Sequence, residues 1–557
     1  MDMQSFSSLE RQRQFERLTQ EEWDVLVIGG GITGSGIALD AASRGMKTAV
    51  VEMQDYAAGT SSRSTKLVHG GLRYLKQFEV KMVAEVGKER EIVYENGPHV
   101  TTPEWMLLPF HQGGNFGPFS TNIGLRVYDY LAGVKKSERR SMMSAEEALK
   151  REPLIKQDGL KGAGYYVEYK TDDARLTLEV MKKAVEYGAN SSNYSKVVDF
   201  IYSDEGRIVG AVVEDTITGE QYNVKAKKII NAGGPWVDEL REIDGSKKGK
   251  TLQLTKGVHL VFDQSVFPLK QAIYFDSPDG RMIFAIPRNG KTYIGTTDTV
   301  YDQDISHPTM TEEDRDYIIK AMNYMFPTVK ATKEDVESSW AGLRPLIHEE
   351  GKDPSEISRK DEIFVSDSGL ISMAGGKLTG YRKMAVTAVD LVRDQLMEET
   401  GVRYSDSETK RMAISGGEVG GSKGFKQFKE ERLKIAESIG IDKEEADKLI
   451  QLYGANVDKV FNNFQNRKEE AEKEGIDPTV FAQLAYALEE EMTFKPVDFF
   501  VRRTAALFFN IQWVRDHKDS VIDYMAESLN YTDEQKKEYT EQLDQLLKEA
   551  VTPVEYV

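Results

Sequence analysis

The sequence predicts an α/β protein that is followed by an all-α C-terminal domain. Up to about residue 404, short apolar runs rich in β-branched residues alternate with helical stretches, which is typical of an α/β fold with an antiparallel element. A glycine-rich stretch at 416–424 has the composition of a linker, and after it helical periodicity with many Glu and Lys prevails. The chain has 557 residues, well above the roughly 250–300 at which a single core stops growing, so more than one domain is expected.

Residues 24–52 are predicted to form the first βαβ unit. A strand at 24–28 enters a glycine cluster, a helix at 34–44 follows, and a second strand at 48–52 ends on Glu52. Further strands are predicted at 206–213, 228–230, 259–262, 282–286 and 292–295. Further helices are predicted at 175–187, 312–325, 430–438, 442–452 and 533–549.

Gly29, Gly31 and Gly34 fit the pattern G-x-G-x-x-G. Glycines at these positions permit a tight turn and a close approach of the backbone, while the N-terminus of the next helix faces a pyrophosphate. Glu52 follows Gly29 by 23 residues and is suitably placed to bind ribose hydroxyls. Because the pattern follows a strand and opens a helix, it predicts a Rossmann-like dinucleotide-binding fold. The pattern alone does not separate FAD from NAD.

The composition excludes several classes of chemistry. The chain contains no cysteine, which excludes disulfides, CxxC redox pairs, cysteine-ligated iron–sulfur clusters and a thiol nucleophile. Its formal charge of -18 argues against nucleic acid as a partner, because phosphate backbones need clustered Lys and Arg. No HxH or HExxH spacing occurs, so a catalytic metal is not supported. Any electron must therefore leave through a bound cofactor.

The sequence predicts a cytoplasmic protein without a transmembrane helix. Residues 1–23 lack the apolar central run of a signal peptide, and no run of about 18 apolar residues occurs. Residues 123–140 combine apolar side chains with a basic cluster from Lys135 to Arg140. This segment is either a solvated amphipathic helix or a peripheral contact with a membrane.

Residues 59–75 read Gly-Thr-Ser-Ser-Arg-Ser-Thr-Lys-Leu-Val-His-Gly-Gly-Leu-Arg-Tyr-Leu. They resemble the signature of FAD-dependent glycerol-3-phosphate dehydrogenases, which belong to a wider group similar to D-amino-acid oxidase. Small hydroxylated residues and glycines let the backbone lie against an isoalloxazine ring and a pyrophosphate, whereas an NAD enzyme needs an open nicotinamide pocket. Segments at 229–236, 340–346, 375–385 and 486–504 resemble the same family, so the likeness covers nearly the whole chain.

The resemblance implies a Rossmann-like FAD-binding fold with a mixed-sheet substrate (cap) subdomain, followed by the all-α C-terminal domain. On this basis residues 1–404 form the oxidoreductase domain and residues 405–557 the helical domain. The expected FAD-binding parts lie near 20–90, 155–255 and 335–404, and the expected substrate subdomain lies near 91–154 and 256–334.

The resemblance also implies which residues contact FAD. They are glycines, small residues and polar residues in the matching segments. The expected set is Gly29, Gly31, Gly34, Glu52, Thr60, Ser61, Ser62, Ser64, Lys66, Leu67, His69, Gly70, Gly71, Ala232, Gly233, Gly376, Lys377, Leu378 and Thr379.

A phosphate-bearing substrate needs permanent positive charge with directional donors, which arginine supplies better than lysine. The matching segments provide Arg73, Arg344, Arg359 and Lys377, with Thr379 beside them, as the expected substrate ligands. Arg344 and Lys377 are also expected to act in catalysis. A solvated surface position is an equal alternative for Arg359 and a weaker one for Arg344.

Oxidation of an alcohol needs a base for the hydroxyl proton. Of the seven histidines, His259 lies in a segment that the family places near the substrate, and it is expected to begin a strand. His259 is the favoured base, and a hydrogen-bonded core histidine is the alternative. The stretch 295–298, Gly-Thr-Thr-Asp, either lines the ligand cavity or forms a tight turn.

The resemblance implies oxidation of sn-glycerol 3-phosphate to dihydroxyacetone phosphate, with quinone as the electron acceptor. The alternatives are a peroxide-forming glycerol-3-phosphate oxidase, an amine oxidase of the same fold and a non-catalytic flavin-binding regulatory protein. A homodimer and a peripheral contact with the inner face of the cell membrane are further expectations from the family.

Overall fold

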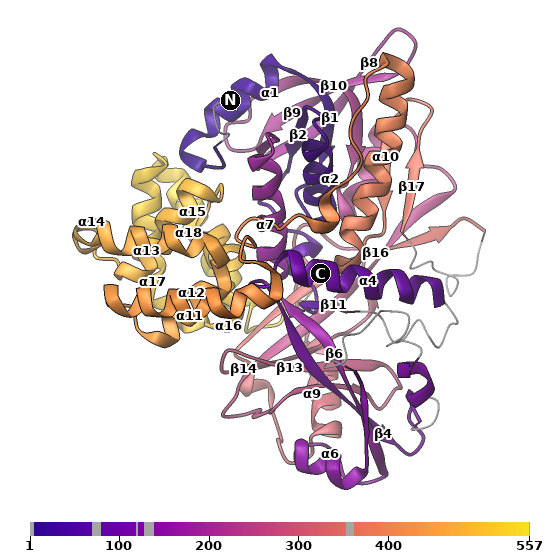
Figure 1. Cartoon of the computed structure of the whole chain (residues 1–557), viewed down its shortest axis with the longest axis vertical. Coiled ribbons are helices and arrows are strands. Elements are labelled where there is room, and N and C mark those ends of the chain that lie inside the picture. The colour runs from indigo at the N-terminus through magenta and orange to yellow at the C-terminus, as the bar shows by residue number, and fades with distance from the viewer. Residues whose placement is uncertain (1–4, 70–79, 118–120, 127–138, 352–360, 556–557) are drawn as a thin grey trace.

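The computed structural model describes all residues except 1–4, 70–79, 118–120, 127–138, 352–360 and 556–557. It contains two large sheets, one above the other in Figure 1, with the C-terminal helices, orange to yellow, gathered on the left. The expected site residues Gly70, Gly71, Arg73 and Arg359 lie outside the described residues, as do Lys135 and Lys136 of the basic cluster from Lys135 to Arg140. Of the helices that the model describes, none is long and apolar enough to cross a membrane.

The first sheet is parallel at its centre. β1 (Glu22–Ile28) pairs in parallel with β2 (Thr48–Val51) on one side and with β10 (Gln221–Asn231) on the other, and α2 (Ile32–Ser43) connects β1 to β2. Six of the seven residues of β1 are buried, because a central parallel strand is covered on both faces and needs a continuous apolar run. The predicted βαβ unit is confirmed.

Helices cover the first sheet next to α2. Figure 1 shows α7 (Asp173–Glu186) and α10 (Tyr381–Thr400) beside α2, and both helices contact it. The other strands of this sheet are β7 (Asn190–Ser192), β8 (Ser195–Tyr202), β9 (Ile208–Asp215), β17 (Glu362–Val365) and β18 (Ile371–Ala374). The predicted helix at 175–187 and the strands at 206–213 and 228–230 lie within or overlap α7, β9 and β10.

The second sheet is mostly antiparallel. Its strands are β3 (Leu67–Val68), β4 (Thr101–His111), β5 (Ser141–Met143), β6 (Leu160–Thr171), β11 (Lys250–Asp263), β12 (Ala272–Asp276), β13 (Met282–Arg288), β14 (Lys291–Gly295), β15 (Thr299–Val300) and β16 (Ser338–Glu349). α9 (Glu312–Met325) packs against β11 and has the bounds that the sequence predicts.

One expectation about the second sheet needs correction. His259 was expected to begin a strand, but β11 already begins at Lys250. The second sheet also includes β6 and β16 from the expected FAD-binding ranges, because β6 pairs along its length with β4 and β16 with β11; the division into FAD-binding and substrate parts stays a prediction. Strand pairing between distant segments extends strands through polar residues, and the local apolar pattern does not encode it.

The C-terminal domain is helical, as predicted. Its main helices are α11 (Gly421–Ile439), α12 (Lys443–Tyr453), α13 (Val457–Asn466), α14 (Lys468–Lys473), α15 (Pro478–Glu490), α16 (Ala506–Phe509), α17 (Ile511–Ser528) and α18 (Asp533–Glu549). The predicted linker at 416–424 is partly wrong, because α11 begins at Gly421. Gly420 and Gly421 have φ values of 79° and 68°, so these glycines shape the entry to the helix.

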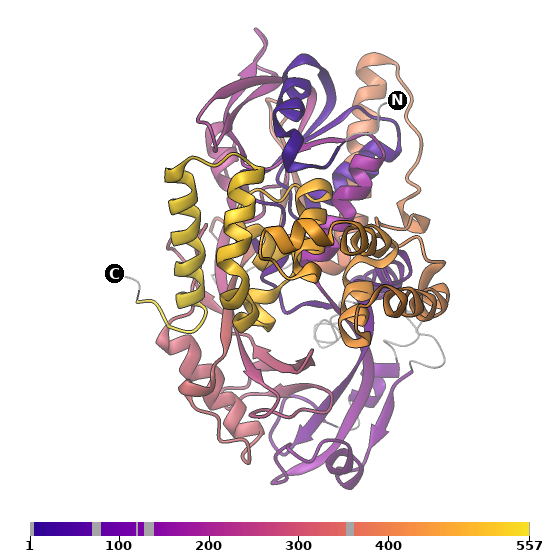
Figure 2. The same cartoon turned by 90° about the vertical axis from the view of Figure 1, so that its left-hand side faces the viewer.

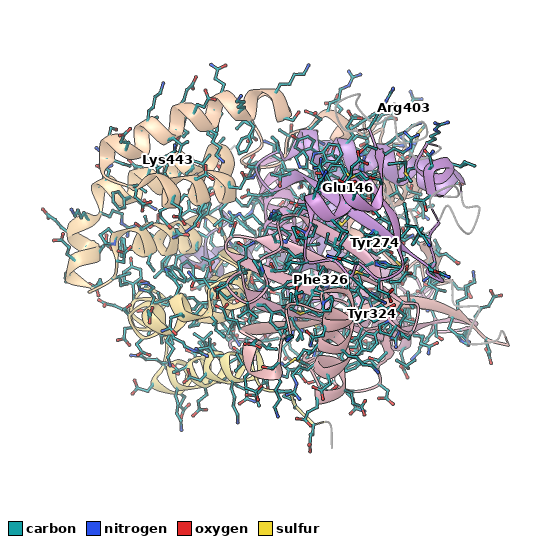
Figure 3. The ribbon with its side chains drawn as sticks, turned by 90° about the horizontal axis from the view of Figure 1, so that it is seen from below. Glu146, Tyr274, Tyr324, Phe326, Arg403 and Lys443 are labelled. Carbon is teal, nitrogen blue, oxygen red and sulfur yellow. The ribbon has the colours of Figure 1, made fainter. Side chains whose placement is uncertain are left out.

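The helical domain packs on the body of the protein and shares its core. Figure 2 shows these helices in front of both sheets, and Figure 3, from below, shows Lys443 to one side of Tyr274 on β12 and of Phe326, which follows α9. The ring of Trp340 on β16 lies 5.2 Å from that of Phe508 and 5.7 Å from that of Phe509, both on α16. The domain therefore supports the strands that form one wall of the site.

Candidate functional site

A cavity of about 870 Å³ is lined by residues of both sheets. We name the lining from the first sheet the glycine wall; it includes the turn after β1, Glu52 and the ends of β10 and β18. We name the lining from the second sheet the strand wall; it includes side chains of β11, β12, β13 and β16. The loop from Gly59 to His69 joins the two walls.

The glycine wall has no room for side chains at its turn. Gly29 has φ of 111°, and a Cβ there would lie 2.5 Å from the carbonyl oxygen of Ala232. A Cβ on Gly34 would lie only 1.8 Å from the carbonyl oxygen of Gly29. The turn at the N-terminus of α2 therefore depends on glycine for close packing, as the sequence pattern indicates.

Glu52 stands at the end of β2 and holds the turn. Its Oε2 accepts a hydrogen bond from the backbone N–H of Gly30 at 2.6 Å, and its Oε1 accepts one from Gln54 at 2.8 Å. Burial raises the pKa of Glu52 to about 6, although both of these hydrogen bonds act to lower it. The carboxylate thus lines the cavity while two backbone N–H groups fix its position.

The short helix η2 (Thr60–Ser62) packs against the N-terminus of α2. Ser61 Oγ accepts a hydrogen bond from the backbone N–H of Ile32 at 3.0 Å, and Thr60 Oγ1 donates to the carbonyl oxygen of Leu343 at 2.7 Å. These two contacts tie the loop to both walls. The N-terminus of a helix such as α2 also offers backbone N–H groups to which a phosphate oxygen can bind.

Residues 375–379 complete the glycine wall at the start of α10. The backbone N–H of Gly376 donates to Asp361 at 2.9 Å, and Thr379 Oγ1 forms 3.1 Å hydrogen bonds with both the N–H and the carbonyl oxygen of His69. Lys377 lies between them and lines the cavity. Burial lowers the pKa of His69, so this imidazole is neutral at physiological pH.

His259 lies on the strand wall and is almost fully buried. Its Nε2 is 3.0 Å from Thr65 Oγ1, and its ring stacks on Trp340 with centroids 4.8 Å apart. Its Nδ1 has no hydrogen-bond partner among the described residues. Burial, reinforced by the positive charges of Arg344 and Lys66, holds the pKa of His259 well below 6.5.

Arg344 projects from β16 beside the loop after β14. Its guanidinium lies 3.2 Å from Asp298 Oδ1 and donates to Thr296 Oγ1 at 3.1 Å. A Cβ on Gly257 would lie 2.4 Å from Nη2 of Arg344, so this glycine leaves space for the guanidinium. Of the stretch 295–298, Thr296, Thr297 and Asp298 line the cavity, which is the first of the two alternatives that the sequence leaves open.

The structure gathers most of the expected site residues at this cavity. Those that line it are Gly29, Gly31, Glu52, Thr60, Ser61, Ser64, Leu67, His69, Ala232, Gly233, His259, Arg344, Gly376, Lys377, Leu378 and Thr379. Gly34, Ser62 and Lys66 are not part of the lining. Lys66 is buried instead in an ion pair with Asp173 at 2.6 Å.

Sequence reasoning did not single out three features of the lining. Arg63 lines the cavity, and no ion pair or hydrogen bond of its side chain is seen within the described part of the chain. Burial lowers the pKa of Arg63 to about 10, so the side chain stays charged at neutral pH. Tyr274 and Phe284 form a stacked aromatic pair on the strand wall, 4.2 Å apart. Arg63 lies in the segment 59–75 that resembles the family signature, and its positive charge could have indicated a binding role from the sequence.

Family models match both parts of the chain. A model described as FAD dependent oxidoreductase matches residues 24–382. A model described as the C-terminal domain of alpha-glycerophosphate oxidase matches residues 407–536. The two matches agree with the division between the two-sheet body and the helical domain.

Individual relatives match over the full length. The aerobic glycerol-3-phosphate dehydrogenase of Bacillus subtilis is 66% identical over 99% of both chains, and that of Staphylococcus epidermidis is 59% identical over 98% of both. The structure of a glycerol-3-phosphate dehydrogenase from Bacillus halodurans complexed with FAD is 51% identical, with a TM-score of 0.86 over 99% of this chain and 100% of that one. The chain therefore belongs to the FAD-dependent oxidoreductase family and, within it, to the aerobic glycerol-3-phosphate dehydrogenases.

Proposed function

We propose that the chain oxidises sn-glycerol 3-phosphate to dihydroxyacetone phosphate with FAD and passes the electrons to quinone. The observation that carries this proposal is the single cavity in which a dinucleotide-type glycine turn and a strand wall with Arg344 and His259 face the same space. The full-length identity to aerobic glycerol-3-phosphate dehydrogenases supports the choice of substrate.

The residues of the glycine wall fit FAD. The turn depends on glycine, because a Cβ at Gly29 would collide with backbone. Glu52 offers a buried carboxylate at the end of β2. We assign Arg63 to the pyrophosphate of FAD, because η2, which it follows, contacts the N-terminus of α2. When bound, FAD accepts the hydride that leaves C2 of the substrate.

Cations of the cavity bind the substrate phosphate in this proposal. Arg344 and Lys377 line the described part of the cavity, and Arg73 and Arg359 are assigned from the sequence alone. Arginine forms two parallel hydrogen bonds with a phosphate, which gives orientation as well as affinity. Thr379 also lines the cavity beside Lys377, although its hydroxyl donates to the carbonyl oxygen of His69.

His259 is the proposed acceptor of the C2 hydroxyl proton. Its low pKa keeps the imidazole neutral at physiological pH, and only the neutral form accepts a proton. Its Nε2 contacts Thr65, which also lines the cavity, so a substrate hydroxyl near Thr65 comes within reach of Nε2. The buried stack on Trp340 fixes the plane of the ring.

An anaerobic titration tests the whole proposal. Addition of glycerol 3-phosphate to the purified protein should remove the visible absorbance of oxidised flavin at one substrate per flavin. Glycerol, which lacks the phosphate, should bleach the flavin far less effectively. Flavin that stays oxidised with excess glycerol 3-phosphate would exclude this substrate and leave the regulatory alternative.

The choice of acceptor rests on the relatives. Relatives that are named dehydrogenases match over 98–99% of both chains, which supports quinone as the acceptor. The family model that matches the C-terminal domain is named after an oxidase, which keeps oxygen as the alternative acceptor. Turnover should be slow in air and rise strongly with a soluble quinone analogue. Rapid turnover in air with one peroxide formed per substrate would replace the dehydrogenase by the oxidase.

A quinone acceptor implies a contact with the membrane, which we propose to be peripheral and on the inner face. The basic cluster from Lys135 to Arg140 is the proposed contact, and its attraction to anionic lipid is expected to weaken as salt rises. Sedimentation with anionic vesicles at low and high salt tests this contact. Equal binding at both salt concentrations would contradict it. The homodimer stays a prediction.

A further inference from the structure

Three buried residues join the C-terminal domain to the loop after β2, and we name them the arginine clamp. Arg503 binds Asp55 through two hydrogen bonds, from Nη1 to Oδ2 at 2.7 Å and from Nη2 to Oδ1 at 2.9 Å. Nε of Arg502 donates to the same Oδ2. Both arginines come from the π-helical turn η10 (Asp498–Arg503), and none of the three side chains is more than 7% exposed.

Asp55 belongs to the loop that fixes the glycine turn. Within this loop, Glu52 accepts the backbone N–H of Gly30, and the N–H of Ala57 donates to the carbonyl oxygen of Gly30 at 3.1 Å. The ring of Tyr56 also packs on Gly30, since a Cβ there would lie 2.6 Å from the ring. The loop that Asp55 anchors therefore makes three separate contacts with Gly30.

The clamp is supported by a second set of contacts. Asn193 donates to Asp55 Oδ1 at 3.1 Å and to the carbonyl oxygen of Met492 at 2.9 Å, so one amide bridges the two domains. Nη2 of Arg502 also donates to Asp498 at 2.6 Å, and the hydroxyl of Tyr194 donates to the same carboxylate at 2.6 Å. Arg502 is thus oriented by Asp498 of the same turn, and Tyr194 of the two-sheet body holds that carboxylate.

The clamp also acts on the charge of Glu52. Burial alone would raise the pKa of Asp55, but the two arginines hold it below its ordinary value, so Asp55 is ionised. After burial and the two backbone hydrogen bonds, Asp55 and Arg502 are the charges that affect Glu52, and they act in opposite directions. A change in the arginine clamp therefore affects Glu52 in two ways: it alters the position of the loop, and it alters the electrostatic potential at the carboxylate.

We propose that the arginine clamp is a positioning device for the cofactor: Arg502 and Arg503 hold the 52–58 loop, so that Glu52 and the glycine turn bind the adenosine half of FAD. Asp55, Arg502 and Arg503 are positioning residues, because none of them lines the cavity. The inference rests on the proposed binding of the ribose by Glu52. It gives the helical domain a part in cofactor retention, in addition to its packing against β16.

The test compares two buried arginines that cross the same domain boundary. Arg503→Lys keeps the charge and removes the two-point contact with Asp55. Arg175→Lys is the matched control, because Arg175 pairs with Glu491, both side chains are fully buried, and Arg175 is not among the lining residues. The readouts are the rate of FAD release from the diluted holoenzyme, the melting temperature, and kcat and KM at saturating FAD.

Arg503→Lys should release FAD at least about tenfold faster, because it loses a charge-assisted pair of hydrogen bonds. Its kcat and KM for glycerol 3-phosphate should stay within about twofold when FAD is saturating, since the strand wall is unchanged. Arg175→Lys should retain FAD at a similar loss of melting temperature. Equal FAD release in the two variants would reduce the clamp to ordinary interdomain packing and overturn the inference.

Two further variants separate the possible failures. If Arg503→Lys does not fold, Arg502→Lys, which loses the Nε donor, is compared with the same control and judged by the same outcomes. Glu52→Ala tests the assumption on which the inference rests. If Glu52→Ala retains FAD, the proposed role of Glu52 in binding the ribose is wrong. If Glu52→Ala loses FAD while the clamp variant retains it normally, only the proposed role of the arginine clamp is wrong.

Discussion

The glycine wall and the strand wall bound one cavity but are built in different ways. The glycine wall consists largely of backbone, and its turn comes from residues that are contiguous in the sequence, from Gly29 to Gly34. The strand wall consists largely of side chains, and His259 and Arg344 reach it only because β11 and β16 pair in register. Backbone defines the shape of the first wall, and side chains define the chemistry of the second.

The two walls should respond differently to substitution. A side chain added to the glycine turn collides with backbone that cannot move away, so the site for the cofactor is lost. A side chain removed from the strand wall leaves the pairing of β11 and β16 intact, so the cofactor stays bound while the reaction slows.

Gly34→Val should abolish flavin binding. Its Cβ would lie 1.8 Å from the carbonyl oxygen of Gly29, a contact that only a displaced turn relieves. The measurement is the ratio of flavin to protein absorbance after gel filtration, with far-UV circular dichroism as the control for folding. A folded variant with full flavin occupancy would show that the turn is not the cofactor site.

His259→Asn should keep its flavin and slow the reduction of that flavin by substrate about 10²–10⁴-fold, the usual contribution of a general base. Stopped-flow mixing with glycerol 3-phosphate measures this step directly. His111→Asn is the matched control, because His111 lies outside the cavity and bonds the carbonyl oxygen of Lys156 at 2.8 Å. Equal rates in both variants would assign the base to another residue.

Arg344→Met should lower kcat/KM at least tenfold with flavin retained, because an unpaired phosphate in the closed site costs about 2–5 kcal/mol. It should also shift the acid limb of the pH profile to higher pH, since the charge of Arg344 helps to hold the pKa of His259 low. Arg432→Met, at a surface pair with Asp458, is the control. An acid limb that does not shift would show that the charge of Arg344 does not affect the pKa of His259.

The sequence predicts the glycine wall better than the strand wall, and the reason is physical. The turn, α2 and Glu52 follow from one contiguous pattern, whereas the full extent of β11 and its pairing with β16 depend on contacts between distant segments. Lys66 lies in the recognised signature, yet its place in a buried pair with Asp173 depends on where α7 packs.

The arginine clamp is the clearest limit of sequence reasoning. Asp55 and Arg503 are separated by 448 positions, and no periodicity or spacing rule connects them. The resemblance of residues 486–504 to the family places Arg503 in a matching segment without assigning its partner. Only the packing of the helical domain brings this guanidinium to the loop beside Glu52.

The smallest expected effect is a pH dependence of stability in the FAD-free protein. The pKa of Glu52 is raised by burial from 4.5 to about 6, so the folded protein binds a proton here more tightly than the unfolded chain does. The stability that Glu52 contributes is therefore fully present below pH 4.5 and is lost as the pH rises through about 6. Glu52→Gln cannot ionise, so relative to this variant the FAD-free wild type should lose on the order of one to a few °C in melting temperature across that range. Parallel melting curves of the two proteins from pH 4.5 to 7 measure the difference, and a constant difference would show that Glu52 keeps its ordinary pKa behind the glycine wall.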